Sequence, residues 1–193
     1  AALPFQLTDA QAQALAEIRR DLASGQQMGR LLQGDVGSGK TAVAALALAD
    51  AASSGFQAAL MAPTEILARQ HFEKLGPLLA SAGVRAVLLT GRDTNGQRRE
   101  KLAALASAPG PGQAHVAIGT HALFQDAVRF DRLALAVIDE QHRFGVGERQ
   151  RLQAKGDPRL GAVHLLTMSA TPIPRTLELT QYGELEVSRL MEK

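Results

Sequence analysis

The segment GDVGSGKT, at residues 34–41, carries glycine, lysine and threonine at the spacing G-x-x-x-x-G-K-[ST]. Glycines let the backbone turn so that successive N–H groups face phosphate oxygens. The amine of Lys40 can then reach the outer phosphates, and the hydroxyl of Thr41 can bind Mg²⁺. The segment therefore predicts a phosphate-binding loop, and the alternative is a glycine-rich turn that binds nothing. Its candidate ligand-binding residues are Gly34, Asp35, Gly37, Ser38, Gly39, Lys40 and Thr41.

Two adjacent carboxylates, Asp139 and Glu140, follow the apolar run LALAVI. A phosphate loop coordinates Mg²⁺ only in part, so a carboxylate at the end of a neighbouring strand can help to hold the ion, directly or through water. We assign that role to Asp139. Glu140 is then the candidate to orient or deprotonate the attacking water. The alternative is a solvated acidic turn without a ligand.

Both segments come directly after short apolar runs, which recur along the chain and are typical of strands buried on both faces. These runs cover residues 30–33, 57–62, 85–90, 115–120, 133–138 and 164–169, with a further strand-like run at 184–190. Alanine- and leucine-rich helical stretches such as 41–52 and 65–80 lie between them, whereas segment 106–113 predicts a surface loop. Crossovers of this length predict one three-layer α/β domain with a mainly parallel central sheet.

The composition excludes several classes of protein. The chain has 193 residues, 46% of them hydrophobic, which indicates one domain with a full core. Cysteine is absent, so disulfides and thiolate metal sites are excluded. No stretch has the length of a membrane span or the layout of a signal peptide, and we expect a cytoplasmic protein. The net charge of +2 permits a nucleic-acid partner but does not argue for one.

Together, the phosphate loop and the acidic segment resemble those of superfamily 2 helicases. The resemblance is to the first motor domain of that family and covers essentially the whole chain. Further matching segments are LPFQLTDAQ (3–11), MAPTEILARQ (61–70), LLTG (88–91), IGTHALFQ (118–125), DEQHRFGV (139–146) and MSATPIPRTL (168–177). The resemblance implies a RecA-like P-loop NTPase fold that uses ATP and Mg²⁺.

The resemblance also implies roles around the nucleotide. Phe5 and Gln11 would recognise adenine, and an amide can indeed bond N6 and N7 of adenine together. The alternative for Gln11 is an exposed helix residue. Gln141 and His142 would sense the γ-phosphate and act in catalysis with Lys40 and Glu140. The alternative for His142 is a core histidine with satisfied hydrogen bonds.

Three residues would couple nucleotide hydrolysis to movement, namely Arg143, Ser169 and Thr171. The short hydroxyls of the SATP segment could exchange hydrogen bonds between the acidic segment and the DNA side. A threonine directly before a proline can also cap a helix, so Thr171 could have both roles.

A DNA-contacting surface is implied after three successive strands. Backbone N–H groups and hydroxyls there could bind phosphates, which positions DNA without reading its sequence. The candidate residues are Pro63, Thr64, Thr90, Gly91, Thr120 and His121. The basic run 91–101 could add electrostatic attraction, and the alternative is a solvated helix face.

Within the family, DEQH followed by RFGV points to helicases that remodel branched DNA, such as stalled forks and Holliday junctions, in recombination and repair. Transcription-repair coupling factors, which look more like DEEQ before RFGV, are one alternative. A nucleotide-gated DNA-binding module with negligible catalysis is another. We expect a monomeric domain excised from a larger protein, without the second motor domain, its arginine finger and the branch-recognising wedge, and therefore nearly inactive in isolation.

Overall fold

The computed structural model of the protein describes residues 7–24, 29–34, 39–107, 113–125, 127–139, 151–156, 163–169 and 186–190. From α1 to β5, helices and strands alternate along the chain, as the sequence predicts. In chain order the elements are α1 (Asp9–Ala23), β1 (Gly29–Gly34), α2 (Lys40–Ser53), β2 (Gln57–Met61), α3 (Glu65–Ser81), β3 (Ala86–Leu89), α4 (Asn95–Ala106), β4 (Val116–Gly119), the 3-10 helix η1 (His121–Phe124), β5 (Leu133–Asp139), β6 (His164–Ser169) and β7 (Glu186–Leu190).

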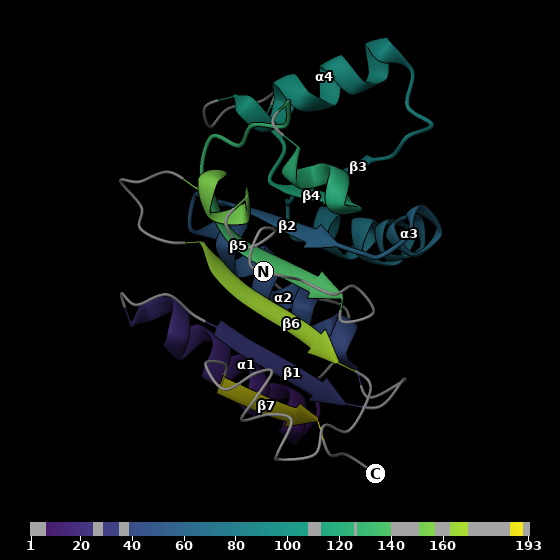
Figure 1. The fold of residues 1–193 in the computed structure, drawn as a ribbon. Helices are drawn as coiled ribbons and strands as arrows, with labels where there is room; N and C mark the ends of the chain where they lie inside the picture. Colours follow the sequence, from purple (N-terminus) through teal and green to yellow (C-terminus); the bar gives the residue numbers. More distant parts are fainter. Residues whose placement is uncertain are drawn as a thin grey trace.

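The strands form one sheet with the order β3-β4-β2-β5-β6-β1-β7, which runs from top to bottom in Figure 1. Every pair of neighbouring strands is parallel. Parallel neighbours need long crossovers, and the helices between the strands provide them. The predicted three-layer α/β fold with a mainly parallel sheet is confirmed, and each described strand begins and ends within two residues of its predicted run.

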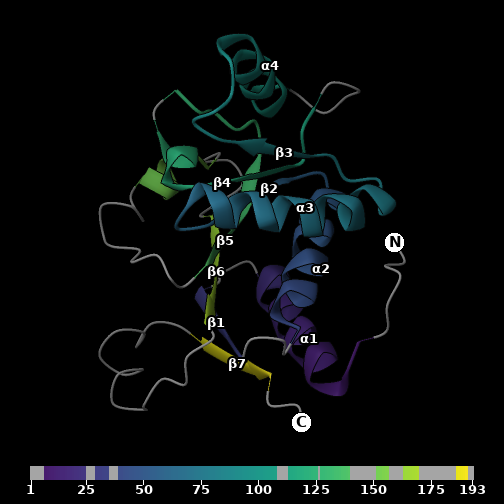
Figure 2. The same cartoon turned by 90° about the vertical axis from the view of Figure 1, so that its right-hand side faces the viewer.

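Two hydrophobic cores lie on opposite faces of the sheet. Helices α1, α2 and α3 pack on one face, for example through Leu48 and Leu75. Figure 2 shows these three helices together on that side of the strands. On the other face, α4, η1 and segment 151–156 contribute Leu105, Leu123 and Leu152. Strands covered on both faces must be apolar throughout, which explains the uncharged runs in the sequence.

Strand β5 alternates between the two cores. Leu135 and Val137 belong to the core under α1, α2 and α3, whereas Ala136 and Ile138 belong to the other. Because consecutive side chains of a strand point to opposite faces, the next residue, Asp139, points to the face of α1, α2 and α3. The strand thus delivers this carboxylate to the side of the sheet on which α2 follows the phosphate loop.

Threonine hydroxyls cap four of the described helices. Thr8 begins α1 with a capping box, in which its hydroxyl accepts from the backbone N–H of Gln11 and the Gln11 side chain accepts from the backbone N–H of Thr8. Helix α2 is different, because it begins after Gly39, which has no side chain to cap it. The other threonine caps are Thr64 at α3, Thr94 at α4 and Thr120 at η1.

Gln57 is a fully buried polar residue at the start of β2. Its side chain has no exposed surface. The amide nitrogen donates to the carbonyls of Leu105 and Ala114, both at 2.8 Å, and the amide oxygen accepts from the backbone N–H of Arg132 at 2.8 Å. All of its described partners are backbone groups, so one side chain joins the start of β2 to the segments around α4, β4 and β5.

Candidate functional site

The candidate site residues gather at one edge of the sheet, because parallel strands present their carboxyl ends together. The neighbouring strands β5, β6 and β1 end at Asp139, Ser169 and Gly34. The other neighbours, β3, β4 and β2, lead into the three loops that carry the DNA candidates. The described strand ends with nucleotide candidates therefore occupy one half of this edge and those with DNA candidates the other, although in the chain all the DNA candidates lie between the phosphate loop and Asp139.

The last residue of the phosphate loop has the backbone conformation that this loop requires. Gly39 has φ 88°, in the left-handed region that favours glycine. A Cβ atom at this position would lie 1.8 Å from Nε2 of Gln11. The backbone conformation therefore favours glycine, and any larger residue would also displace the end of the Gln11 side chain. Helix α2 starts at the next residue, so the positive end of its dipole faces the loop.

Lys40 lies at the start of α2 and directs its amine to the carbonyl oxygen of Gly34, the last residue of β1. The amine thus joins the two described ends of the phosphate loop, Gly34 and the start of α2. Thr41 is the next residue of the helix and is partly exposed. Both placements agree with the predicted roles, which remain predictions.

Asp139 lies at the carboxyl end of β5, as predicted, but β5 is not a neighbour of the phosphate-loop strand. Strand β6 lies between β5 and β1, so the expectation of a neighbouring strand was wrong. The sequence could not reveal this, because spatial strand order does not follow chain order in a parallel sheet. The oxygen donors Asp139 and Thr41 are nevertheless on the same face, since α2 packs there, and hard oxygen donors fit Mg²⁺.

His71 is a close partner of Asp139 that the sequence analysis did not single out. Nε2 of His71 lies 3.1 Å from Oδ2 of Asp139. The two side chains are only 17% and 18% exposed. His71 comes from α3, which begins at the DNA half of the edge. In the sequence, His71 is three residues after Ala68 and four before Leu75, which places it on the buried face of α3. This spacing could have singled it out.

Gln11, the predicted adenine reader, uses both ends of its amide within the chain. Its oxygen accepts from the backbone N–H of Thr8 at 2.9 Å, and its nitrogen donates to the carbonyl of Gly39 at 3.3 Å. The residue is only 8% exposed, so the alternative of an exposed helix residue is wrong. The amide lies directly against the phosphate loop, and its contact with adenine remains a prediction.

The hydroxyls predicted to contact DNA all stabilise local structure. Thr64 and Thr120 cap α3 and η1. The Thr90 hydroxyl accepts from the backbone N–H of Arg92 at 3.2 Å. A hydroxyl that accepts in a cap still carries a proton that it can donate. These roles are therefore compatible with the predicted phosphate contacts, which the structure does not test.

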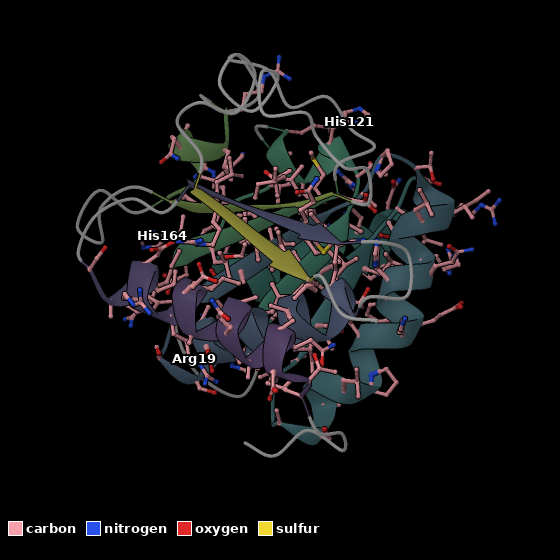
Figure 3. The ribbon with its side chains drawn as sticks, turned by 90° about the horizontal axis from the view of Figure 1, so that it is seen from below. Arg19, His121 and His164 are labelled. Atoms are coloured by element: carbon pink, nitrogen blue, oxygen red, sulfur yellow. The ribbon has the colours of Figure 1, made fainter. Side chains whose placement is uncertain are left out.

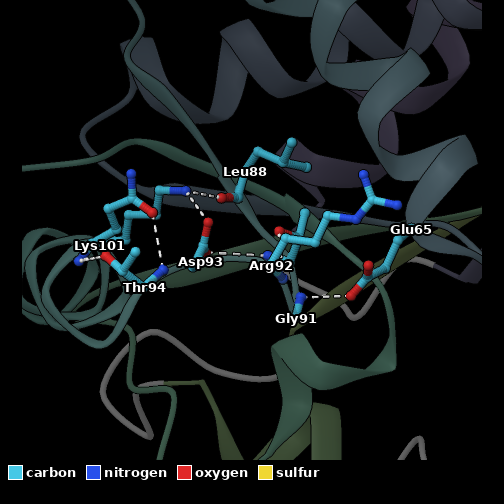
Figure 4. A network of polar contacts seen from close by, with 9 residues as sticks. Glu65, Leu88, Gly91, Arg92, Asp93, Thr94 and Lys101 are labelled. Carbon is cyan, nitrogen blue, oxygen red and sulfur yellow. Dashed lines mark hydrogen bonds and ion pairs between the residues drawn. The ribbon is translucent and has the colours of Figure 1, made fainter.

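The loop after β3 is fixed by a polar network, drawn in Figure 4. The carboxylate of Asp93 accepts from the backbone N–H of Thr90 at 3.2 Å and from the amine of Lys101 at 2.8 Å. Lys101 also donates to the carbonyl of Leu88. Lys101 belongs to the basic run 91–101, and here its charge neutralises a carboxylate of the same loop. Arg99 is exposed on α4, which fits the alternative of a solvated helix face.

Glu65 connects this loop to α3. Its carboxylate accepts from the backbone N–H of Gly91, one of the groups predicted to bind DNA phosphate. A cavity of about 390 Å³ lies beside the network, between α3, β3 and α4, and Arg69, Arg85 and Lys101 are among its lining residues. The loop after β3 and the start of α3, which follows β2, are thus connected at the DNA half of the edge.

Several predicted site residues lie outside the described part of the chain. They are Phe5, Asp35, Gly37, Ser38, Glu140, Gln141, His142, Arg143 and Thr171. The backbone of Ser169 is described and pairs in register with Gln33, next to Gly34. Because β6 also pairs with β5, Ser169 lies between the acidic strand and the phosphate loop, where its predicted coupling role would act.

Two of the described side chains away from this edge have shifted pKa values. A hydrogen bond to Asp50 raises the pKa of Arg19 on α1, with a further contribution from the charge of that carboxylate, while burial opposes the shift. Burial lowers the pKa of His164 at the start of β6, partly offset by Asp21. His121, by contrast, lies at the carboxyl edge of the sheet and on the face opposite α1 (Figure 3).

The family profile described as DEAD/DEAH box helicase matches residues 8–180. The chain therefore belongs to the DEAD/DEAH box helicase family, and the helicase resemblance expected from its motifs is confirmed.

Within this family, the chain is similar to proteins named ATP-dependent DNA helicase RecG. It is 53% identical over 186 residues to RecG of Streptococcus pneumoniae, covering 96% of this chain and 26% of the relative. It is 52% identical over 191 residues to RecG of Bacillus subtilis, covering 98% and 27%. A solved structure of RecG bound to a three-way DNA junction matches 99% of this chain and 24% of that chain, with 43% identity and a TM-score of 0.83. The chain spans about a quarter of the length of these relatives.

In the part of the chain that the structure describes, no helix is long and apolar enough to cross a membrane, and no three or more His, Cys, Asp or Glu side chains form a group that could hold a metal ion.

Proposed function

We propose that this chain is the ATP-binding motor domain of a DNA helicase that remodels branched DNA, such as stalled forks and Holliday junctions, in recombination and repair. The observation that carries the proposal is the division of the sheet edge into adjoining halves, one with the phosphate loop and acidic residue and the other with the DNA candidates. The similarity to RecG, including a RecG bound to a three-way DNA junction, supports branched DNA as the substrate.

Each nucleotide candidate has a role in this proposal. Lys40 and the N-terminus of α2 bind the phosphates, Thr41 and Asp139 hold Mg²⁺, and Glu140 orients the attacking water. When bound, Mg²⁺ neutralises charge on the transferred phosphoryl group. Gln141 and His142 sense the γ-phosphate, and the coupling residues Arg143, Ser169 and Thr171 relay its loss toward the DNA half. Phe5 and Gln11 recognise adenine.

The partners in this proposal are DNA and, in cis, a second motor domain and a branch-recognising wedge. The relatives are about four times as long as this chain, which leaves room for both. The motor works as a monomer. A cytoplasmic location fits an enzyme that consumes ATP and acts on bacterial DNA.

A nucleotide titration tests the central claim. Lys40→Ala removes a positive charge facing the phosphates, and hydrogen bonds to charged groups contribute about 1.5–3 kcal/mol. ATP affinity should therefore fall roughly 10- to 100-fold while adenosine affinity changes little. The measurement is binding of a fluorescent ATP analogue, with and without Mg²⁺, and competition by adenosine. Equal losses for ATP and adenosine would remove the phosphate-loop assignment.

A nucleotide-gated DNA-binding module is the second candidate. It is favoured by helix α3, which contacts the Gly91 backbone through Glu65 and Asp139 through His71 and so links the two halves within this chain. ATP turnover with and without forked DNA, in a protein of the relatives' length, separates the two. Turnover stimulated by DNA identifies a motor, whereas unchanged turnover with nucleotide-dependent DNA affinity identifies the module.

A further inference from the structure

His71 is the residue whose environment the proposed function leaves unexplained. Helix α3 buries a stripe formed by Ala68, Leu75 and Leu79 against the sheet. Residues three and four apart share a helix face, so position 71 falls within this stripe. An apolar residue would be expected there, yet the position holds an imidazole. A polar group on a buried face needs a hydrogen-bonding partner, because its burial is otherwise unfavourable.

The partner of His71 is Asp139, the proposed Mg²⁺ carboxylate. Nε2 of the imidazole and Oδ2 of the carboxylate are 3.1 Å apart, which is within hydrogen-bonding distance for a ring N–H donor. Both side chains are largely buried, so solvent screens the contact only in part. A carboxylate held by one oxygen can no longer rotate freely about its terminal bond. Such a contact therefore fixes the direction in which the group can meet a cation.

Helix α3 ties this contact to the DNA half of the edge. Its first residue, Glu65, accepts from the backbone N–H of Gly91, and His71 lies six residues further along the same helix. Figure 4 shows Glu65 directed to Gly91. A helix is a rigid connection over this length, because each turn is held by backbone hydrogen bonds. The same element therefore touches the loop after β3 and the acidic end of β5.

We propose that His71 is a positioning residue, which holds Asp139 in the orientation that binds Mg²⁺ together with the nucleotide and does so from the helix that also contacts the DNA-side loop. This inference rests on the proposed function, because it takes Asp139 as a Mg²⁺ carboxylate. His71 acts through the carboxylate and touches neither the nucleotide nor the ion.

The test measures nucleotide binding as a function of Mg²⁺ concentration in the 193-residue chain. His71→Leu keeps a side chain of similar size but removes the hydrogen bond. Loss of such a partner typically weakens metal binding by about 10- to 100-fold, so the Mg²⁺ concentration for half-maximal nucleotide binding should rise by that factor. Nucleotide affinity without Mg²⁺ should stay unchanged, which a general defect in folding would not produce.

Two further variants complete the design. His71→Gln keeps an N–H donor at a similar reach and should restore Mg²⁺ dependence to within about threefold of the original chain. Glu73→Gln, at an exposed position on the same helix, is the matched control and should have no effect. If His71→Leu does not fold, His71→Asn replaces it, because asparagine is polar but too short to reach the carboxylate and should also raise the Mg²⁺ requirement.

The outcomes separate this inference from the proposed function. If the original chain binds nucleotide without any dependence on Mg²⁺, the proposed metal site is wrong, and the positioning role of His71 is wrong with it. If the original chain depends on Mg²⁺ and the Leu or Asn variant has the same requirement, the metal site stands and the role of His71 is overturned. A raised requirement in these variants that glutamine reverses supports the proposal.

Discussion

Gln11 is a single amide with two possible uses. Within the chain it completes the capping box of α1 and donates to the carbonyl of Gly39 in the phosphate loop. The predicted use is recognition of adenine, which the amide could make through the second lone pair of its oxygen and the second N–H of its nitrogen while both of these contacts remain. The two uses differ in one measurable respect, since only adenine recognition distinguishes one nucleotide base from another.

Gln11→Ala should therefore reduce the preference for ATP over GTP, by about 1–3 kcal/mol if the amide contacts adenine at two atoms. The dissociation constants of both nucleotides, measured with Mg²⁺, check this. Gln13→Ala, at an exposed position on the same helix, is the control and should change neither constant. Equal weakening of ATP and GTP in the Gln11 variant would show that the amide supports only the cap and the loop.

His164 is a residue whose effect on stability depends on pH. Burial lowers the pKa of its imidazole in the folded protein. The unfolded chain therefore takes up a proton at a higher pH than the folded chain does. The contribution of His164 to the free energy of unfolding is fully present above the pKa of histidine in the unfolded chain, about 6.5. This contribution is lost as the pH falls below that pKa.

The free energy of unfolding, measured with urea, should therefore fall between about pH 7.5 and about pH 5, a range that brackets this pKa. His164→Gln should make the fall shallower, because glutamine takes up no proton. His121→Gln serves as the control for the removal of a histidine at another place. An identical slope in the original chain and in His164→Gln would contradict the prediction.

At the scale of elements, Gln57 connects four segments through backbone hydrogen bonds. Gln57→Leu would remove all three bonds and leave buried backbone groups without this partner, at about 1–3 kcal/mol for each group left unsatisfied. Since Leu105 keeps another donor, the N–H of Asp131, we expect a total loss of about 2–4 kcal/mol in the free energy of unfolding.

Urea unfolding at neutral pH measures this loss. Gln70→Leu is the matched control, because Gln70 is exposed on α3 and its replacement should change stability by less than about 0.5 kcal/mol. A loss in the Gln57 variant no greater than in the control would mean that packing alone joins these segments.

At the scale of the whole molecule, hydrolysis needs more positive charge than the described nucleotide half provides. Lys40 and Mg²⁺ face the phosphates in the proposed site. The family resemblance places a further arginine on a second motor domain, and absence of an arginine finger typically costs about 10³–10⁵ in rate. The 193-residue chain should therefore bind ATP but hydrolyse it at close to the background rate, and forked DNA should not stimulate it.

Phosphate release, measured in a preparation free of contaminating ATPase, tests this prediction against a protein of the relatives' full length. DNA-stimulated turnover at the rate of the longer protein would overturn it. That result would mean that an arginine of this chain, such as Arg143 or Arg175, completes the site, or that two copies complete it together.

The sequence by itself determined the elements and the chemistry of the phosphate loop. Strand runs buried on both faces are short and uncharged, and the spacing of glycine, lysine and threonine is set by local backbone geometry, so both can be recognised without the fold. The prediction that polar residues follow each strand and meet at one edge also came from local pattern together with the parallel arrangement. These features depend on residues close together in the chain.

Only the tertiary structure decided how the strands are ordered and which distant side chains meet. Strand β6 lies between β5 and β1, although it follows β5 in the chain. Two contacts, His71 with Asp139 and Glu65 with Gly91, join residues that are distant in the chain. The contact of Lys101 with Asp93 depends on a side-chain direction that the sequence pattern leaves open. Sequence spacing specifies the face of a helix on which a residue lies but not the element that packs against that face. The role of a histidine in an apolar stripe can therefore be inferred only once the structure shows that a carboxylate of the sheet is its partner.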